Sequence, residues 1–457
     1  MPTSNGVGIA LKQFGRSECH GYCSVVCPLP VPPVQDINRE LSPAGRSIAM
    51  LALIVAGEAV FFLPFVLPRI FRPTLLDVFH LTNLQLGIAF SVYGVVAMLA
   101  YFPGGPLADR YSARKLMSFA LVATSIGGLA LATIPSLAAL QVLYGFWGVT
   151  TILLFWAPLI RATRAWGGAK LPGRAFGILD GGRGLVAAAI GSGAVALFSF
   201  FMPAEIQNAT FDQRADAFRQ VILLFSGITF AAAIFVWFAL PRSTKSSNDS
   251  HNKYEPGGVG RVLRMPTVWL QSIVVVCAYV GYKGLDDVSL YAHEVLEFDE
   301  VQAASVGTLS MWVRPFAAIA AGLLADRFGV SRMTILSLLV FGIGSTVIAV
   351  GAFRPGMTVF FFATLIATSA AVFALRGLYY AMMEAGRVPF GDTGSAVGIV
   401  SVVGYTPDVF MGPLMGVLLD RWPGELGHQF VFAVLTFSAT VGLTASVLFW
   451  RIVSRPT

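Results

Sequence analysis

Two arginines in the second half of the chain, Arg314 and Arg376, lie in apolar stretches with no acidic residue three or four positions away. Residues at those spacings share one face of a helix, so neither guanidinium has a neutralising partner on its own helix. An ionised side chain inside a membrane must then face a cavity, an acid on another helix or a ligand. Because a guanidinium donates two parallel hydrogen bonds to a carboxylate, phosphate or sulfonate, both arginines are candidates for contacting an anionic substrate.

Two further cations have acids close by in the sequence, and their roles stay open at this stage. Arg183 follows Asp180 by three residues, and Lys283 precedes Asp286 and Asp287 by three and four. Each set either neutralises itself on one helix face or contacts the substrate. With the tyrosines that lie beside the cations, the candidate substrate-binding residues are Arg314, Arg376, Arg183, Lys283, Tyr282 and Tyr379.

Glu58 and Asp408 are lone acids in the middle of apolar stretches. Each either pairs with an arginine across a helix interface or carries a coupling proton, because burial disfavours the charged carboxylate. Together with Asp180 they are the candidate proton-coupling residues. An arginine–acid pair that breaks when the substrate arrives would couple the proton to the anion.

The composition is that of an integral membrane protein. Hydrophobic residues make up 56% of the 457 residues and charged residues only 12%, against about 25% charged residues in soluble domains. The net charge of +7 comes from basic residues in short loops, so we expect the lipid bilayer and a small solute as partners, and no nucleic acid.

The sequence has no phosphate-binding loop of the Walker type, so we do not expect ATP to drive this chain. The five His lie in tails, loops or the ends of apolar stretches, and we expect none among intramembrane carboxylates. We therefore expect no metal, no cofactor and no catalytic residue.

Cys19, Cys23 and Cys27 lie in an N-terminal tail for which disorder is favoured, with metal binding and reversible lipidation as alternatives.

Twelve stretches are long and apolar enough to cross a membrane, six on each side of a polar segment that begins at Pro241. They are 47–68, 84–104, 115–134, 138–163, 175–201, 218–240, 266–291, 303–324, 332–352, 357–383, 395–419 and 429–451. The chain therefore divides into an N-terminal tail (1–46), a six-helix bundle (47–240), a linker (241–265), a second six-helix bundle (266–451) and a C-terminal tail (452–457).

Basic residues predict the orientation in the membrane. The loops on the side of the linker hold most of them, and the opposite loops hold only Arg69, Arg72, Arg214, Arg354 and Arg421. Both termini and the linker are therefore expected in the cytoplasm, with the protein a multi-pass component of the cell membrane.

One phrase occurs twice, each time between two apolar stretches. Gly105-Pro-Leu-Ala-Asp109-Arg110-Tyr-Ser-Ala-Arg114 is repeated as Gly322-Leu-Leu-Ala-Asp326-Arg327-Phe-Gly-Val-Ser, with the two Asp 217 residues apart. Gly173-Arg-Ala-Phe-Gly-Ile and Gly394-Ser-Ala-Val-Gly-Ile repeat at nearly the same spacing, which indicates an internal duplication. Duplicated halves are typical of secondary transporters, which bind substrate between the repeats.

The repeated phrase resembles the loop motif that joins the second and third helices in each half of transporters of the major facilitator superfamily. The resemblance covers roughly residues 45–452. It implies an all-α fold of twelve transmembrane helices in two pseudo-symmetric six-helix bundles that rock about a central cavity. It also implies that Asp109 and Asp326 steady the outward-open state near a helix N-terminus, which favours a carboxylate. The motif residues are Gly105, Asp109, Arg110, Arg114, Gly322, Asp326 and Arg327.

Shorter phrases are similar to a bacterial branch that stands near organophosphate, nitrate and sulfonate-sugar permeases. They are Tyr101-Phe-Pro-Gly-Gly, Leu179-Asp-Gly-Gly-Arg, Gly281-Tyr-Lys-Gly and Gly404-Tyr-Thr-Pro-Asp. This likeness implies a small anion as the substrate. Ala97 stands where the nitrate carriers have an arginine in the second helix, which argues against nitrate itself.

We therefore expect a monomeric secondary transporter, not an enzyme. It would move a small organic anion (a carboxylate, phosphate ester or sulfonate) by proton symport with alternating access. Three alternatives stay open. One is exchange of one anion for another, which would need no protonatable acid. The second is a non-transporting solute receptor on the same fold, although the short C-terminal tail argues against it. The third is a cation exporter, against which the unpaired arginines count.

Overall fold

The computed structural model describes residues 42–167, 172–241, 258–353, 357–379, 381–388 and 393–454. The N-terminal tail with Cys19, Cys23 and Cys27 and most of the linker lie outside the described residues. The described part is helical and contains no strand. Within these residues, eleven helices are long and apolar enough to cross a membrane, and a bent pair of helices, counted as one span, brings the number to twelve. The twelve predicted spans are therefore confirmed in their places, with ends that differ by a few residues.

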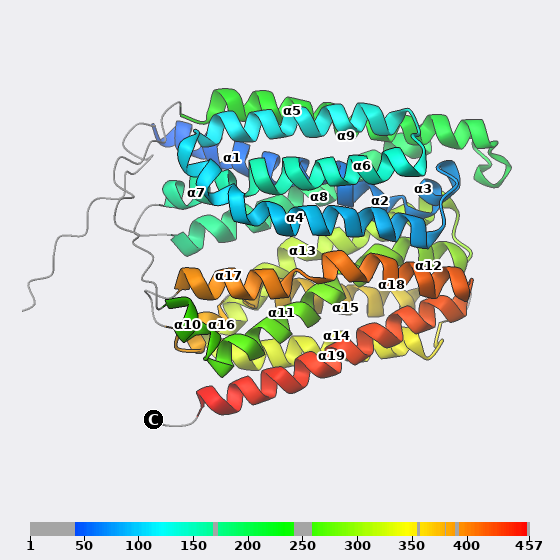
Figure 1. Cartoon of the computed structure of the whole chain (residues 1–457). Helices are drawn as coiled ribbons and strands as arrows, with labels where there is room; N and C mark the ends of the chain where they lie inside the picture. The colour runs from blue at the N-terminus through cyan, green and yellow to red at the C-terminus, as the bar shows by residue number, and fades with distance from the viewer. Residues whose placement is uncertain are drawn as a thin grey trace, which may run out of the picture. The chain divides into compact units, whose positions relative to one another are not determined.

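Six spans form the first bundle, which Figure 1 shows in blue to green. In chain order its elements are α1 (Pro43–Ala59), η2 (Phe62–Val66), α2 (Leu67–Ile70), α3 (Arg72–Val78), α4 (Asn83–Arg110), α5 (Ala113–Ala132), α6 (Leu137–Gly148), η3 (Val149–Trp156), α7 (Ala157–Gly167), α8 (Pro172–Phe201), η4 (Ile206–Asn208) and α9 (Phe211–Ala239).

The second bundle repeats this plan and is shown in green to red (Figure 1). After the short α10 (Gly258–Leu263) come α11 (Pro266–Gly284), η5 (Leu285–Asp287), α12 (Val288–Glu294), α13 (Glu300–Phe328), α14 (Val330–Ala349), α15 (Thr358–Leu378), α16 (Met382–Ala385), α17 (Thr393–Gly404), α18 (Pro407–Arg421) and α19 (Glu425–Val453). Each bundle has its own hydrophobic core.

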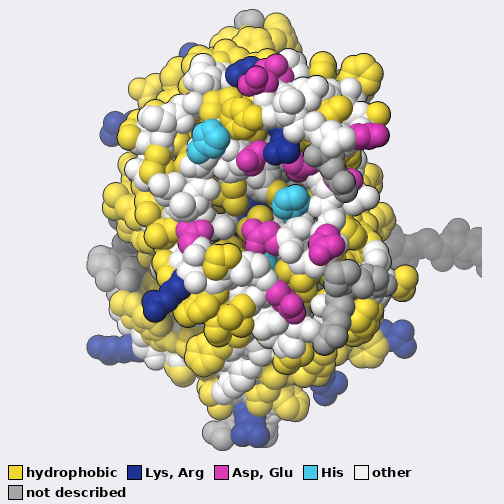
Figure 2. All heavy atoms as spheres, turned by 90° about the vertical axis from the view of Figure 1, so that its right-hand side faces the viewer, with side chains coloured by type: hydrophobic (Ala, Val, Ile, Leu, Met, Phe, Trp, Pro, Cys, Tyr) yellow, Lys and Arg dark blue, Asp and Glu magenta, His cyan; other side chains and the backbone are white. Residues whose placement is uncertain are grey.

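We call the end of the bundles at which α9 stops and α10 begins the linker end, and the opposite end the far end. Three spans that start at the far end, α4, α9 and α13, begin with the same device. Thr82, Thr210 and Asp299 each accept a hydrogen bond from the backbone of a glutamine three residues on, whose side chain bonds back to the capping residue. This capping box satisfies two backbone N–H groups that the helix leaves unpaired. Figure 2 shows the far-end face, over which acidic side chains are spread.

Three spans are interrupted in mid-membrane. The first bends by 42° between α1 and α2, where a π-helical stretch contains Pro64. The seventh passes through the 3-10 turn η5, and the eleventh breaks before Pro407, which has no N–H to continue the hydrogen bonding of α17. Irregular backbone inside a membrane is tolerated where it lies within the protein or lines a cavity. The breaks therefore indicate where a polar site is built.

The two bundles approach most closely near the far end, where α4 packs on α18. A Cβ atom on Gly87 would lie 2.2 Å from the carbonyl oxygen of Gly412, and one on Gly416 would lie 2.4 Å from Leu84 Cα. Asp420, near the end of α18, accepts hydrogen bonds from the backbone N–H groups of Asn83 and Leu84 at 2.9 and 2.8 Å. The far end is therefore closed by backbone contact and by a carboxylate that caps a helix of the other bundle.

Glycines near the linker end have no such neighbours. A Cβ atom on Gly105, Gly177, Gly322 or Gly398 would meet no heavy atom within 4 Å. Phe102 and Phe316, one in each bundle, are exposed. Among the described residues, the close contacts between the bundles thus lie toward the far end.

Gly87→Ala tests the far-end contact, because its new methyl group would meet the backbone of α18. We expect a lower thermal unfolding midpoint, since overpacking typically costs about 1–3 kcal/mol. Gly193→Ala, on α8, is the matched control, because a Cβ atom there meets nothing within 4 Å. Equal midpoints for the two variants would contradict the close contact.

Candidate functional site

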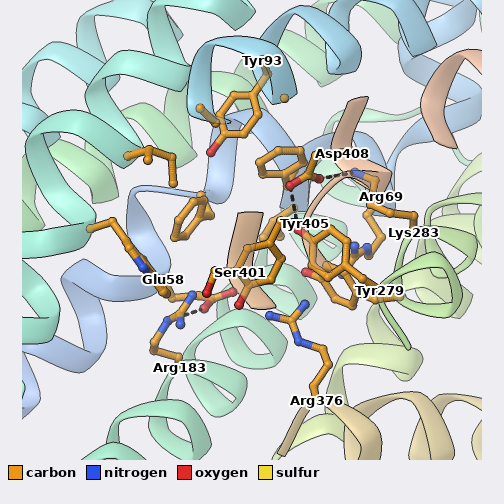
Figure 3. Close-up of a pocket in the computed structure, with 18 of the residues that line it drawn as sticks. Glu58, Arg69, Tyr93, Arg183, Tyr279, Lys283, Arg376, Ser401, Tyr405 and Asp408 are labelled. Carbon is orange, nitrogen blue, oxygen red and sulfur yellow. Dashed lines mark hydrogen bonds and ion pairs between the residues drawn. The ribbon is translucent and has the colours of Figure 1, made fainter. Parts of the chain in front are cut away.

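A cavity lies between the bundles at the level of the helix breaks (Figure 3). Its empty space of about 1120 Å³ includes the part that opens to solvent. Its charged lining residues are Glu58, Arg69, Arg183, Lys283, Arg314, Arg376 and Asp408. Its aromatic lining residues are Phe61, Phe65, Tyr93, Tyr101, Trp156, Tyr279, Tyr282, Phe373 and Tyr405.

A first network of charges surrounds Glu58, which is buried. Arg183 Nε lies 3.1 Å from its Oε2 and also donates to the carbonyl oxygen of Gly57 at 3.0 Å. Arg314 Nη1 lies 3.3 Å from Glu58 Oε1, and Nη2 donates to Asp180 Oδ1 at 2.8 Å. Arg314 comes from the second bundle and its acids from the first, so this network ties the bundles together.

A second network lies between the first and the far end. Arg69 Nε, in the first bundle, donates to Asp286 Oδ1 at 2.6 Å. Lys283 Nζ lies 3.3 Å from Asp286 Oδ2 and 3.5 Å from Asp408 Oδ1. The Tyr279 hydroxyl donates to Asp408 Oδ2 at 2.9 Å (Figure 3). Arg69–Asp286 is therefore a second ion pair between the bundles, and its side chains are 5% and 7% exposed.

Arg376 is the lining cation that no described carboxylate pairs with. Its Nη1 is buried and has no hydrogen-bond partner among the described residues. Its guanidinium carbon lies 3.9 Å from the ring centre of Tyr282 and 5.7 Å from that of Tyr279. In Figure 3 the guanidinium points toward the middle of the cavity. The ring faces stabilise the positive charge, but they leave the N–H donors available to an anion.

The helix breaks explain where these groups lie. Glu58 is near the end of α1, where the helix carries partial negative charge, so the carboxylate needs the two arginines. Asp408 lies in the first turn of α18, at a helix N-terminus that favours a carboxylate. Asp286 and Asp287 are neighbours in the turn η5, which directs them to different partners, Arg69 in the first bundle and His428 in α19.

The structure brings most of the predicted site residues together. Arg183, Lys283, Arg314, Arg376 and Tyr282 line the cavity. Tyr379 does not line it in the described structure, but its hydroxyl lies 3.2 Å from that of Tyr405, which does. Of the acids, Glu58 and Asp408 line the cavity, whereas Asp180 is not among the lining residues but contacts Arg314, with its side chain 43% exposed.

The acids that these cations contact differ from one cation to the next. Lys283 contacts Asp286, three residues on, as one helix face allows. Arg183 lies 3.9 Å from Asp180 but only 3.1 Å from Glu58, a residue of another helix. Arg314 is neutralised entirely by acids on other helices.

Two expectations were wrong. We placed Arg69 and Arg72 in an outer loop, but the first span continues to Ile70 and so contains Arg69, while Arg72 begins α3; both arginines are buried, 5% and 3% exposed. Their burial follows from their partners, Asp286 and Asn83. We also expected no His among intramembrane carboxylates, but His428 is buried between Asp287 and Glu294. In the sequence, only the apolar residues that flank Arg69 indicated that its side chain is buried.

The repeated motif lies at the linker end. Arg110, Asp326 and Arg327 are exposed there, and the side chain of Asp109 lies outside the described residues. Arg114 packs over the ring of Trp237, with its guanidinium carbon 4.3 Å from the ring centre. Gly105 and Gly322 have open space at the Cβ position. The role of the motif in steadying the outward-open state stays a prediction.

Comparison with known proteins shows which protein family this sequence matches. The family model described as Major Facilitator Superfamily matches residues 48–299. The sequence is similar to the inner membrane protein YihN of Escherichia coli (strain K12), 25% identical over 410 residues that cover 88% of this chain and 95% of that protein. It is also similar to the inner membrane protein YqcE of the same strain, 26% identical over 391 residues that cover 84% of this chain and 90% of that protein.

Solved structures of transporters have a similar fold. A bacterial homologue of the human lysosomal transporter Spinster, in an inward-facing and unoccupied conformation, aligns with a TM-score of 0.70 and 17% identity over 91% of this chain and 100% of that chain. The nucleoside transporter NupG aligns with a TM-score of 0.68 and 11% identity over 89% of this chain and 100% of that chain. At these identities the likeness shows the fold alone, and it confirms the two six-helix bundles.

Glu58→Gln tests the first network, because it leaves Arg183 and Arg314 short of a buried carboxylate. We expect a loss of about 3–5 kcal/mol of stability, the usual effect of breaking a buried ion pair, measured as a lower thermal unfolding midpoint. Asp180→Asn is the comparison, since its half-exposed side chain should contribute much less. An equal fall in both variants would contradict the central place of Glu58.

Proposed function

Since the chain belongs to the Major Facilitator Superfamily and is a multi-pass integral membrane transporter, we propose that it carries a small organic anion by proton symport. Arg376 carries this proposal. Its Nη1 is a buried donor without a hydrogen-bond partner among the described residues, and, unlike the other cations of the lining, Arg376 pairs with no described carboxylate. A carboxylate, phosphate ester or sulfonate would complete its hydrogen bonding.

The rest of the lining supports an organic rather than an inorganic anion. Tyr282 and Tyr279 flank Arg376, and Trp156 and Phe61 lie near Arg183. Aromatic rings around a few well-placed polar groups are typical of pockets for organic ligands. The head group of the solute would bind Arg376, and its body would pack on the rings.

Among the three candidate acids, the contacts favour Asp408 as the coupling residue. Glu58 and Asp180 are held by arginines, whose side chains stay charged. Asp408 Oδ1 is buried without a hydrogen-bond donor, and the nearest cation, Lys283, is 3.5 Å away. A proton on Asp408 would release Lys283 and alter the charge beside the substrate.

The far-end contacts suit a state that is open toward the cytoplasm. Basic residues at the linker end, including Arg110 and Arg327, favour a cytoplasmic position for that end and for both termini. Closure by Asp420 at the opposite end then corresponds to an inward-open state. Transport would require the Arg69–Asp286 pair and the Asp420 cap to part when the far end opens.

The substrate class is tested by thermal unfolding of the detergent-purified protein with carboxylates, phosphate esters, sulfonates, amino acids and organic cations. A ligand that binds only the folded state stabilises it, by about 2.7 kcal/mol at a hundredfold excess over Kd. We expect one anion class to raise the midpoint and Arg376→Gln to abolish the rise. Arg451→Gln, an exposed arginine at the end of α19, should keep it. Stabilisation by cations or neutral solutes alone would overturn the anion assignment.

The coupling is tested in proteoliposomes with the anion that stabilises the protein. Asp408→Asn should lose uptake driven by an inward pH gradient and keep exchange of labelled for unlabelled anion, because only the driven process needs the proton. Asp77→Asn, an acid at the far end paired with Arg214, should keep both. Uptake by the wild-type protein that does not depend on the pH gradient would favour anion exchange instead of symport.

A further inference from the structure

A buried histidine lies outside the cavity, between two carboxylates. His428 Nδ1 is 2.7 Å from Asp287 Oδ2, and its Nε2 is 3.2 Å from Glu294 Oε2. His428 and Asp287 have side chains that are fully buried, whereas the Glu294 side chain is 31% exposed. The three groups therefore form a line from the far-end surface into the second bundle.

Polar atoms next to His428 lack hydrogen-bond partners and could bind a proton. Asp287 Oδ1 and the Tyr291 hydroxyl are buried without hydrogen-bond partners among the described residues, and the Tyr291 ring packs edge-on against the imidazole at 5.3 Å. Imidazole gains and loses a proton in the physiological range, unlike most side chains. A carboxylate with a free oxygen next to it provides a second position for the same proton.

Charges on the neighbouring helices are engaged elsewhere. The helices packed on α19 are α11, α12, α14 and α18. Lys283 of α11 pairs with Asp286 and Asp408, and Asp420 of α18 caps α4. Arg332 of α14 lies at the linker end, and Glu425 of α19 itself accepts a hydrogen bond from Gln429. Among the described residues, the carboxyl groups of Asp287 and Glu294 are thus the partners of His428.

We propose that His428, Asp287 and Glu294 form a proton-binding site that is loaded from the far-end surface and is separate from the cavity. Glu294 exchanges protons with water at the far end, and His428 passes them to Asp287. This assigns a proton to residues beyond the cavity acids of the proposed symport.

The site is connected to the transport machinery through one peptide bond. Asp287 follows Asp286 in the turn η5, and Asp286 holds Arg69 of the first bundle together with Lys283. A change of charge at Asp287 therefore acts directly on the ion pair that joins the bundles near the far end. Proton binding outside the cavity would in this way bias the opening of that end.

The test is nuclear magnetic resonance of the full chain in lipid nanodiscs with ¹⁵N-labelled histidine. Only five His are present, and His428→Gln identifies the signal of interest. If that variant does not fold, replacing the other four His leaves the same signal alone. As the pH is raised from about 4 to about 10, we expect the His428 nitrogens to change from the doubly protonated to the neutral pattern, over a range that brackets the ordinary imidazole pKa of about 6.5.

Glu294→Gln should displace the midpoint of that titration and slow the exchange of the ring N–H with water. Glu297→Gln, an acid of the same far-end loop, should leave both unchanged. A His428 signal that does not titrate would make the cluster a static ion pair and overturn the proposal. A titration that Glu294→Gln leaves unaltered would overturn the loading route. Neither result depends on the transported solute, so failure here is distinct from failure of the anion assignment.

Discussion

The structure depends on one constraint: charge placed inside a membrane must be compensated inside the protein. Glu58 is held by Arg183 and Arg314, and Asp286 by Arg69 and Lys283. Because both sets draw partners from the two bundles, neutralising the charges also ties the bundles together. Any motion that separates the bundles must therefore supply new partners, and a charged solute in the cavity is one such partner.

The breaks in the spans serve the same constraint. A continuous helix presents its side chains to fixed neighbours, whereas the turn η5 directs adjacent aspartates to Arg69 and to His428. The break before Pro407 places Asp408 at a helix N-terminus that faces the cavity. Arg376 has no such compensation from a carboxylate in the described part of the chain, which is why we propose it as the group that binds the anion.

Much of this could be predicted from the sequence, and the misses share a cause. Length and hydropathy located twelve spans, and helical spacing gave the Lys283–Asp286 contact as one of the open alternatives. Spacing along one helix says nothing about partners on other helices. Arg69 lies 217 residues from Asp286, and His428 lies 141 from Asp287, so neither pair leaves a local signal. From the sequence alone, residues at the ends of spans cannot be distinguished from loop residues, because their partners lie on other helices.

The central claim is that the cavity binds an anion through the one lining cation that no described carboxylate neutralises. A structure of the protein with the most strongly stabilising anion tests it most directly. We expect the head group to lie within hydrogen-bonding distance of Arg376, with Tyr282 against the ligand and the Glu58 network intact. A head group bound to Arg183 or Arg314 in place of Glu58, with Arg376 left without contact to the ligand, would contradict it.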